Sequence, residues 1–211
     1  YGDADNDTIT SAGTNDYVDA GEGDNTITIS SDAIGGEFVS GSGTDVYLIE
    51  DGASSPSRLS SLKVQSGGGD DVVNSDSFLS YQARFELGEG NDTINFNQKI
   101  GFQSYIYGQG GDDNINILDG ADGNGRYITV DGGSGNDEII LEGDFKNNDY
   151  NKFRGQTGND IINASNAIGL SGYDNYLDGG DGDDIIIGGS GDDTFYGGNN
   201  DDILNAGGGN D

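Results

Sequence analysis

The chain has 211 residues, of which 39 are acidic, 8 are basic and 40 are glycine, and its formal net charge is −31. Nucleic acid and anionic membranes are poor candidates for partners because both would repel so acidic a chain. Without cysteine or histidine, the chain has no disulfide framework, no thiolate metal site and no imidazole ligand. No apolar run approaches the roughly 18 residues that a membrane span requires.

Composition also bears on folding. Only 31% of the residues are hydrophobic, so little apolar surface is available to offset the chain entropy lost on folding. Unless the carboxylates are neutralised, such a chain is expected to stay disordered. A bound cation is the natural source of the missing positive charge.

The chain begins and ends in the same kind of repeat. Residues 1–29 and 177–211 consist of nine-residue units, each with a glycine-rich turn, while residues 30–176 keep such a turn at longer intervals. We expect one solenoid domain over 1–211. Because the sequence opens inside one repeat and stops inside another, at GGGND, we also expect it to belong to a longer chain.

Each turn ends in a polar residue that fixes the register of the repeat. Two places after this residue, and seven places before it from Asn25 onward, stands an apolar or aromatic residue. This spacing predicts two short strands around each turn, each sending a large side chain inward. One edge of the stack then carries Asp7, Asn25, Asp45, Asp71, Asp92, Asp113, Asp137, Asp160, Asp184 and Asp202; the second edge carries Asp16, Asp193 and Asp211.

The predicted fold is therefore an all-β parallel β-roll or β-helix solenoid of about ten coils, stacked at about 4.7 Å per coil. Stacking would place the turn carboxylates in a column about 5 Å apart, where their repulsion amounts to several kcal/mol in order of magnitude. Calcium relieves this repulsion because it accepts six to eight carboxylate and carbonyl oxygens. Glycine lets the turn direct its carbonyls inward.

We predict roughly ten calcium ions, placed between successive turns. Magnesium is less suited because it requires stricter geometry and gives up its water reluctantly. Asn25 departs from the acidic pattern, and we expect Asp24 to compensate for it. The predicted metal ligands are Asp7, Asp24, Asn25, Asp45, Asp71, Asp92, Asp113, Asp137, Asp160, Asp184, Asp193, Asp202 and Asp211.

These turns resemble a known repeat. GGSGNDEII at 132–140, GGDGDDIII at 179–187 and GGSGDDTFY at 188–196 are similar to the GGxGxDxUx nonapeptide of the RTX (repeats-in-toxin) family, where U is a large apolar residue. The resemblance implies a right-handed parallel β-roll with calcium between its turns. It also implies type I secretion as an unfolded chain, followed by folding in extracellular calcium. The longer middle coils depart from the regular family pattern.

The second edge of the middle coils is irregular. Its segments are 30–37, 50–62, 75–84, 97–104, 119–127, 142–152 and 165–175. Either their side chains seal a wider core, or they form a contact surface for a partner. In or beside these segments lie Arg58, Lys63, Arg84, Lys99, Arg126, Lys146, Lys152, Arg154, Phe78, Tyr81, Phe102, Phe145, Tyr150, Tyr173 and Pro56.

The leading hypothesis is a non-catalytic, calcium-dependent structural module of an extracellular cell-surface protein, such as a surface-layer protein or a large adhesin. Its partners would be calcium, neighbouring repeats of the parent chain or identical subunits. A carrier module of a secreted enzyme, such as a protease or a polysaccharide epimerase, is the alternative.

Three further hypotheses carry less weight. An enzyme within this chain is disfavoured because no carboxylate pair stands out and histidine is absent. An ice-binding face would need an unbroken outward ladder of threonines, whereas the outward positions here turn to asparagine and then to apolar residues. Acidic loops that merely confer solubility would explain neither the glycines nor the fixed register.

Overall fold

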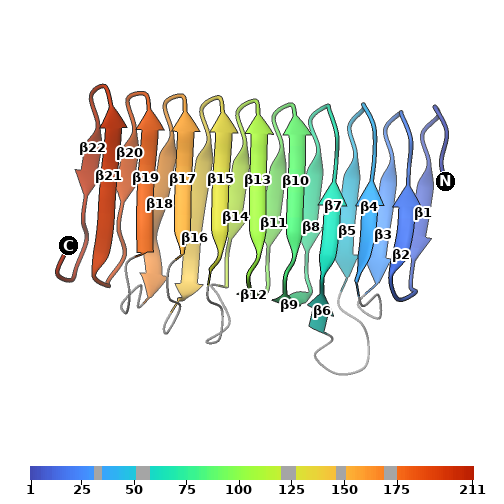
Figure 1. Cartoon of the computed structure of the whole chain (residues 1–211), viewed down its shortest axis with the longest axis horizontal. Coiled ribbons are helices and arrows are strands. Elements are labelled where there is room, and N and C mark those ends of the chain that lie inside the picture. Colours follow the sequence, from blue (N-terminus) through green and yellow to red (C-terminus); the bar gives the residue numbers. More distant parts are fainter. Residues whose placement is uncertain (31–34, 51–57, 120–126, 146–150, 169–174) are drawn as a thin grey trace.

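The computed structural model describes residues 1–30, 35–50, 58–119, 127–145, 151–168 and 175–211. Over these residues the chain forms short strands that wind into coils stacked side by side in a flat slab (Figure 1). None of its described elements is a helix long and apolar enough to cross a membrane. The predicted all-β parallel solenoid is confirmed.

One wall of the solenoid is a ten-stranded sheet, in the order β1-β3-β5-β8-β11-β14-β16-β18-β20-β22. Its neighbouring strands pair in parallel, and the register shifts by the length of one coil: Thr8 pairs with Thr26, Thr26 with Val46 and Val46 with Val72. Its strands are β1 Thr8–Ser11, β3 Thr26–Ser30, β5 Val46–Glu50, β8 Val72–Ser75, β11 Thr93–Phe96, β14 Asn114–Ile117, β16 Glu138–Asp144, β18 Ile161–Ile168, β20 Ile185–Ile187 and β22 Ile203–Asn205.

The opposite wall is a nine-stranded parallel sheet that faces the viewer in Figure 1. The parallel register pairs Phe85 of one strand with Ile106 of the next, and the alternation along each strand turns both side chains inward. Its strands are β2 Asp16–Asp19, β4 Gly36–Val39, β7 Leu62–Gln65, β10 Arg84–Glu89, β13 Tyr105–Gly110, β15 Thr129–Ser134, β17 Lys152–Thr157, β19 Asn175–Asp181 and β21 Asp193–Asn199.

The core lies between these two walls. Phe85 and Phe96 meet edge to face with ring centroids 5.1 Å apart. The inward residues predicted on both sides of the turns are buried through the middle coils, as the period-two pattern requires. The terminal coils differ because each has a neighbour on one side only: Leu204 is 48% exposed, and Ile9 and Phe195 are only partly buried.

A third sheet lies at the second edge and was not predicted from the sequence. It is formed by β6 (Arg58–Ser60), β9 (Phe78–Tyr81) and β12 (Ile100–Phe102), again in parallel. Tyr81 stacks on Phe102 with ring centroids 5.1 Å apart, and Tyr81 remains exposed. The three coils that contain these strands therefore have three walls, whereas the described terminal coils have two.

The structure redistributes the residues assigned to the irregular edge. Phe145 belongs to the core, where it meets Phe153 edge to face at 6.3 Å. Four basic residues lie on the outer face of the nine-stranded sheet, because each alternates along its strand with an inward residue; they are Lys63, Arg84, Lys152 and Arg154. Pro56, Arg126, Lys146, Tyr150 and Tyr173 lie outside the described residues.

The outer face of the ten-stranded sheet carries an asparagine ladder. The amide of Asn95 donates to Asn74 at 2.8 Å, and that of Asn116 donates to Asn95 at 2.9 Å. In the next coil Ile140 occupies the equivalent position, so the ladder ends there. The side-chain amides thus bond to one another across neighbouring strands.

The turn glycines are packed against backbone of the neighbouring coil. Gly69 has a φ of +119°, and a Cβ placed on it would lie 2.1 Å from the carbonyl oxygen of Gly43. Gly68 has an ordinary φ, and its nearest contact would be 3.7 Å away. Of these two adjacent glycines, only Gly68 has room for a larger side chain.

We expect Gly69→Ala to destabilise the calcium-loaded protein by more than the roughly 1 kcal/mol of a left-handed alanine, because a backbone clash adds to the strain. Gly68→Ala is the matched control and should lie within about 0.5 kcal/mol of the parent. Urea unfolding in excess calcium measures both. Equal stability of the two variants would contradict the close stacking of the turns.

Candidate metal centre

One edge of the slab consists of the turns that lead from the nine-stranded sheet into the ten-stranded sheet, along the top of Figure 1. Each turn places one residue of the predicted series directly before a strand of the ten-stranded sheet, as Asp92 precedes Thr93 of β11. Most of these side chains are at most 2% exposed although they are acidic. The buried members are Asn25, Asp45, Asp71, Asp92, Asp113, Asp137, Asp160 and Asp184.

These residues form what we call the inner column: Asp7, Asn25, Asp45, Asp71, Asp92, Asp113, Asp137, Asp160, Asp184 and Asp202. The backbone N–H of each donates to the side-chain Oδ1 of the next, as from Asp92 to Asp113 at 2.8 Å and from Asp113 to Asp137 at 2.9 Å. One carboxylate oxygen per residue is therefore used to connect neighbouring coils.

The residue before each inner member forms a second, exposed column. Here the hydrogen bonds run the other way: the N–H of Asn91 donates to Asp70, and that of Asp112 donates back to Asn91. Sequence analysis missed this outer column, although a short polar residue stands at each of its positions. Its members are Asn6, Asp24, Thr44, Asp70, Asn91, Asp112, Asn136, Asn159, Asp183 and Asp201.

The second carboxylate oxygen of the inner aspartates has no donor. In seven successive turns this Oδ2 atom is buried without a hydrogen-bond partner among the described residues. The carbonyl oxygen of the glycine two places earlier, such as Gly111 in the Asp113 turn, also receives no hydrogen bond from them. The seven residues are Asp45, Asp71, Asp92, Asp113, Asp137, Asp160 and Asp184.

Such buried oxygens disfavour the ionised form. Burial is the main cause that raises the pKa of these carboxyls, and neighbouring aspartates of the column add to it, whereas the backbone N–H bonds act in the opposite direction. The pKa is about 8 for Asp71 and Asp113, about 7 for Asp160 and Asp193, and about 6 for Asp92 and Asp137. At neutral pH a nearby positive charge would therefore be needed to stabilise the ionised carboxylates of the column.

Asn25 shows what that charge would contact. Its Oδ1 accepts the N–H of Asp7 at 2.9 Å, as an aspartate of the column would. Its amide nitrogen then takes the place of the second oxygen and donates to the carbonyl oxygens of Gly23 at 2.9 Å and Gly21 at 3.4 Å. In this turn the side-chain amide of Asn25 itself supplies the positive end of a dipole to the carbonyl oxygens. In the aspartate turns a carboxylate oxygen occupies the same place.

The oxygen-rich turns fit calcium. Carboxylate and backbone carbonyl oxygens are the ligands that calcium prefers. Within the described residues no three acidic side chains converge on one point. A cation at this edge would therefore take most of its protein oxygens from the backbone, which is why the inward-facing carbonyls of the glycine turns matter.

The remaining predicted ligands differ from these seven. Asp24 lies in the outer column, where its Oδ1 accepts the N–H of Thr44 at 3.0 Å. Asp7 and Asp202 are half-buried members of the terminal coils. At the second edge the N–H of Asp193 donates to Asp211 at 2.9 Å, and Asp193 keeps an unpartnered Oδ1.

Asp16, also at the second edge, differs from Asp193. Its carboxylate accepts hydrogen bonds from the hydroxyl of Ser11 and, at 3.1 Å, from the N–H of Gly13. Both bonds go to the same oxygen, Oδ2, and come from Asp16's own turn. The two ends of the chain therefore do not present equivalent second-edge turns.

Comparison with known protein families gives one match. The model of the RTX calcium-binding nonapeptide repeat matches four copies, over residues 1–27, 129–144 and 171–211. Gly132 and Gly179 of the matched turns leave room for the carboxylate, since a Cβ on either would lie within 2.2 Å of Oδ2 of Asp137 or Asp184. Among the unmatched turns this position holds Ser40, Ser66 and Leu87 in three, but Gly108 and Gly155 keep the glycine in two others. No curated protein and no solved structure gave a significant match.

We expect Asn25→Asp to increase the calcium bound by about one ion, because a carboxylate oxygen would replace the built-in donor. Equilibrium dialysis with metal analysis counts the ions. Asn205→Asp, an exposed position in the last strand, makes the same change of charge and should leave the count unchanged. An unchanged count for Asn25→Asp would contradict the idea that the Asn25 amide takes the place of a bound calcium ion.

The metal-free chain should fold better in acid. The inner carboxyls have folded-state pKa values above the unfolded value of about 3.9, so their protonation favours the fold below pH 4 and this contribution is lost as the pH rises through about 6 to 8. Circular dichroism of metal-free protein should show more β structure at pH 5 than at pH 8. Saturating calcium should remove the difference. A metal-free chain equally folded at both pH values would show that these carboxyls do not oppose folding.

Proposed function

This chain belongs to the RTX calcium-binding nonapeptide repeat family, and we propose that it is a non-catalytic structural module of a secreted cell-surface protein, such as a surface-layer protein or a large adhesin. It is a calcium-binding β-roll module, and its fold and its metal requirement are two aspects of one property. The proposal rests on the row of buried, unpartnered carboxylate oxygens at the turn edge.

Calcium would be held between successive turns by the inner aspartates. Each ion would receive carboxylate oxygen from the inner column and carbonyl oxygen from the glycine turns, and it would supply the positive charge that both lack. The ions perform no chemistry on a substrate in this role. They neutralise the edge, so that binding free energy becomes folding free energy.

The same coupling suits secretion. A chain of net charge −31 that depends on calcium remains extended where calcium is scarce, and it folds where calcium is plentiful. Passage through a type I secretion channel as an unfolded chain followed by extracellular folding is consistent with this behaviour. The absence of cysteine means that calcium performs the stabilising role that disulfides play in many small secreted domains.

A structural role is supported by how the carboxylates are used. The inner column joins neighbouring coils through Oδ1, and the outer column joins them in the opposite direction. These side chains are thereby committed to stacking rather than to proton transfer. The elaborated middle coils, with their third sheet, exceed what a simple carrier of regular nonapeptides would need.

Asp113→Asn tests calcium-coupled folding. The amide can still accept the N–H of Asp92, but it removes a carboxylate oxygen between the turns at 92 and 137. We expect the calcium count to fall by about one ion and the calcium midpoint of folding, followed by circular dichroism, to rise severalfold.

Asp76→Asn is the matched control, because Asp76 lies exposed at the second edge and its side chain accepts a hydrogen bond, among the described residues, only from Asn97. It makes the same change of charge, and its calcium count and midpoint should equal those of the parent. Equal effects of the two variants would show that overall charge, rather than the turn edge, governs folding. A parent chain that keeps its β structure in a chelator at pH 8 would overturn the proposal.

A further inference from the structure

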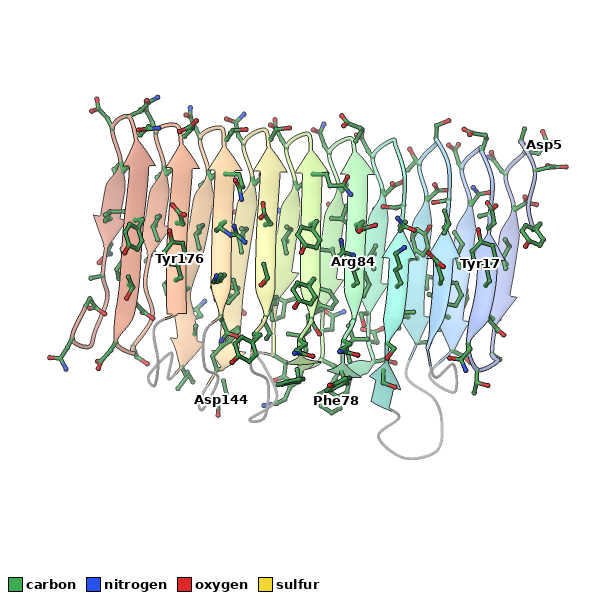
Figure 2. The ribbon with its side chains drawn as sticks, in the orientation of Figure 1. Asp5, Tyr17, Phe78, Arg84, Asp144 and Tyr176 are labelled. Carbon is green, nitrogen blue, oxygen red and sulfur yellow. The ribbon has the colours of Figure 1, made fainter. Side chains whose placement is uncertain are left out.

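The outer face of the nine-stranded sheet concentrates the positive charge of an otherwise acidic molecule. Of the five basic side chains that the structure describes, four lie on this face: Lys63, Arg84, Lys152 and Arg154. The fifth, Lys99, lies beside the third sheet. Figure 2 shows Arg84 in the middle of the face, with Tyr17 and Tyr176 toward its two ends. The calcium edge uses none of these residues.

A depression of about 490 Å³ lies on this face between β13 and β17. Its lining contains two cations and three tyrosines but no carboxylate: Gln103, Tyr105, Tyr107, Tyr127, Thr129, Lys152 and Arg154. The rings of Tyr105 and Tyr107 are parallel, with centroids 6.4 Å apart. We call this pair of parallel rings, with the basic side chains beside it, the tyrosine platform.

The cations around the platform are not equally engaged. The Arg84 guanidinium lies 4.7 Å from the centroid of the Tyr107 ring and pairs with Glu86. Arg154 has a carboxylate, Asp131, only at 3.6 Å. Lys152 is exposed and has no ion pair with any described residue. Among the described residues, Lys152 therefore gives the depression a positive charge that no ion pair neutralises.

Backbone strain accompanies this face. Gln109 and Gln156 have φ of +82° and +87° at the turn position that glycine holds in the neighbouring coils, such as Gly133. Tyr127, on the rim of the depression, has a φ of +66°. A non-glycine residue in this region costs about 1–2 kcal/mol, and such strain clusters at ligand-binding positions.

We propose that this depression binds an acidic polysaccharide, with one uronic-acid unit over the tyrosine platform. The rings of Tyr105 and Tyr107 would stack against the apolar face of the sugar, and Lys152 and Arg154 would bind its carboxylate. Neighbouring strands are about 4.8 Å apart, comparable to the length of one pyranose unit, so a glycan crossing the strands keeps step with them.

The surroundings select this occupant. The chain as a whole is strongly acidic, so a polyanion as dense as nucleic acid is repelled. An acidic peptide offers carboxylates but no flat ring face matched to the tyrosine pair. A polymer with one carboxylate on each flat, hydroxyl-rich ring matches both the cations and the platform.

The test uses the whole calcium-loaded chain and a hexamer of galacturonic acid as the probe. Titration calorimetry and the intrinsic tyrosine fluorescence, unobscured because tryptophan is absent, follow binding. Lys152→Gln and Tyr107→Ala should each weaken binding at least tenfold. The fully methyl-esterified hexamer, which lacks the charge, should bind at least tenfold more weakly than the acid.

Lys99→Gln is the matched control: it removes the same charge beside the third sheet, next to Ile100 of β12. Binding should be unchanged in this variant, and circular dichroism in calcium verifies that every variant is folded. If Tyr107→Ala does not fold, Arg154→Gln replaces it with the same expected loss. Equal weakening by Lys99→Gln and Lys152→Gln would indicate long-range charge attraction instead of binding at this depression, and no binding at millimolar hexamer would likewise overturn the proposal.

Discussion

Repulsion among buried oxygens at the turn edge is the constraint on which this structure depends. Parallel stacking places each inner aspartate over the next, and one oxygen of each is satisfied by the backbone N–H of its neighbour. The other oxygen is left without a donor in seven successive turns. Because the outer column bonds in the reverse direction, each turn is held to both neighbours. Hydrogen bonds thus fix the register, and a cation is needed to make that register stable near neutral pH.

The turn edge could be predicted from the sequence because its landmarks recur at fixed offsets. Phe85, Asp92 and Ile94 stand in the same relation as Ile106, Asp113 and Ile115, so strands, core and column follow together. The second edge offers no such landmarks. Nothing in the local pattern of FLSY or IGF shows that these segments form a third sheet, because their pairing depends on how far each coil bulges. The burial of Phe145 depends on the same long-range geometry.

Within the candidate site, the sequence identifies the inner aspartates but not the use of their individual oxygens. The substitution of asparagine at position 25 reads as a weakened ligand with Asp24 as its substitute. The structure places Asp24 in the exposed column and gives Asn25 an amide that contacts two carbonyls. Which atom faces the metal position is decided by the hydrogen bond from the neighbouring coil. That bond becomes visible only once the coils are stacked.

The outer face of the nine-stranded sheet could be predicted from the sequence only in part. Its basic residues could have been placed from the sequence, since Arg84 immediately precedes the inward Phe85 and must point outward. The backbone strain could not have been predicted from the sequence, because the left-handed φ at Gln109, Gln156 and Tyr127 arises only when the coils are stacked. Gly88, Gly133 and Gly180 occupy the same turn position as the two glutamines without that strain. The inner and outer columns join neighbouring coils along the turn edge. A solenoid held in this way can keep such residues in place, so a rigid edge would support the binding that we propose on the adjoining face.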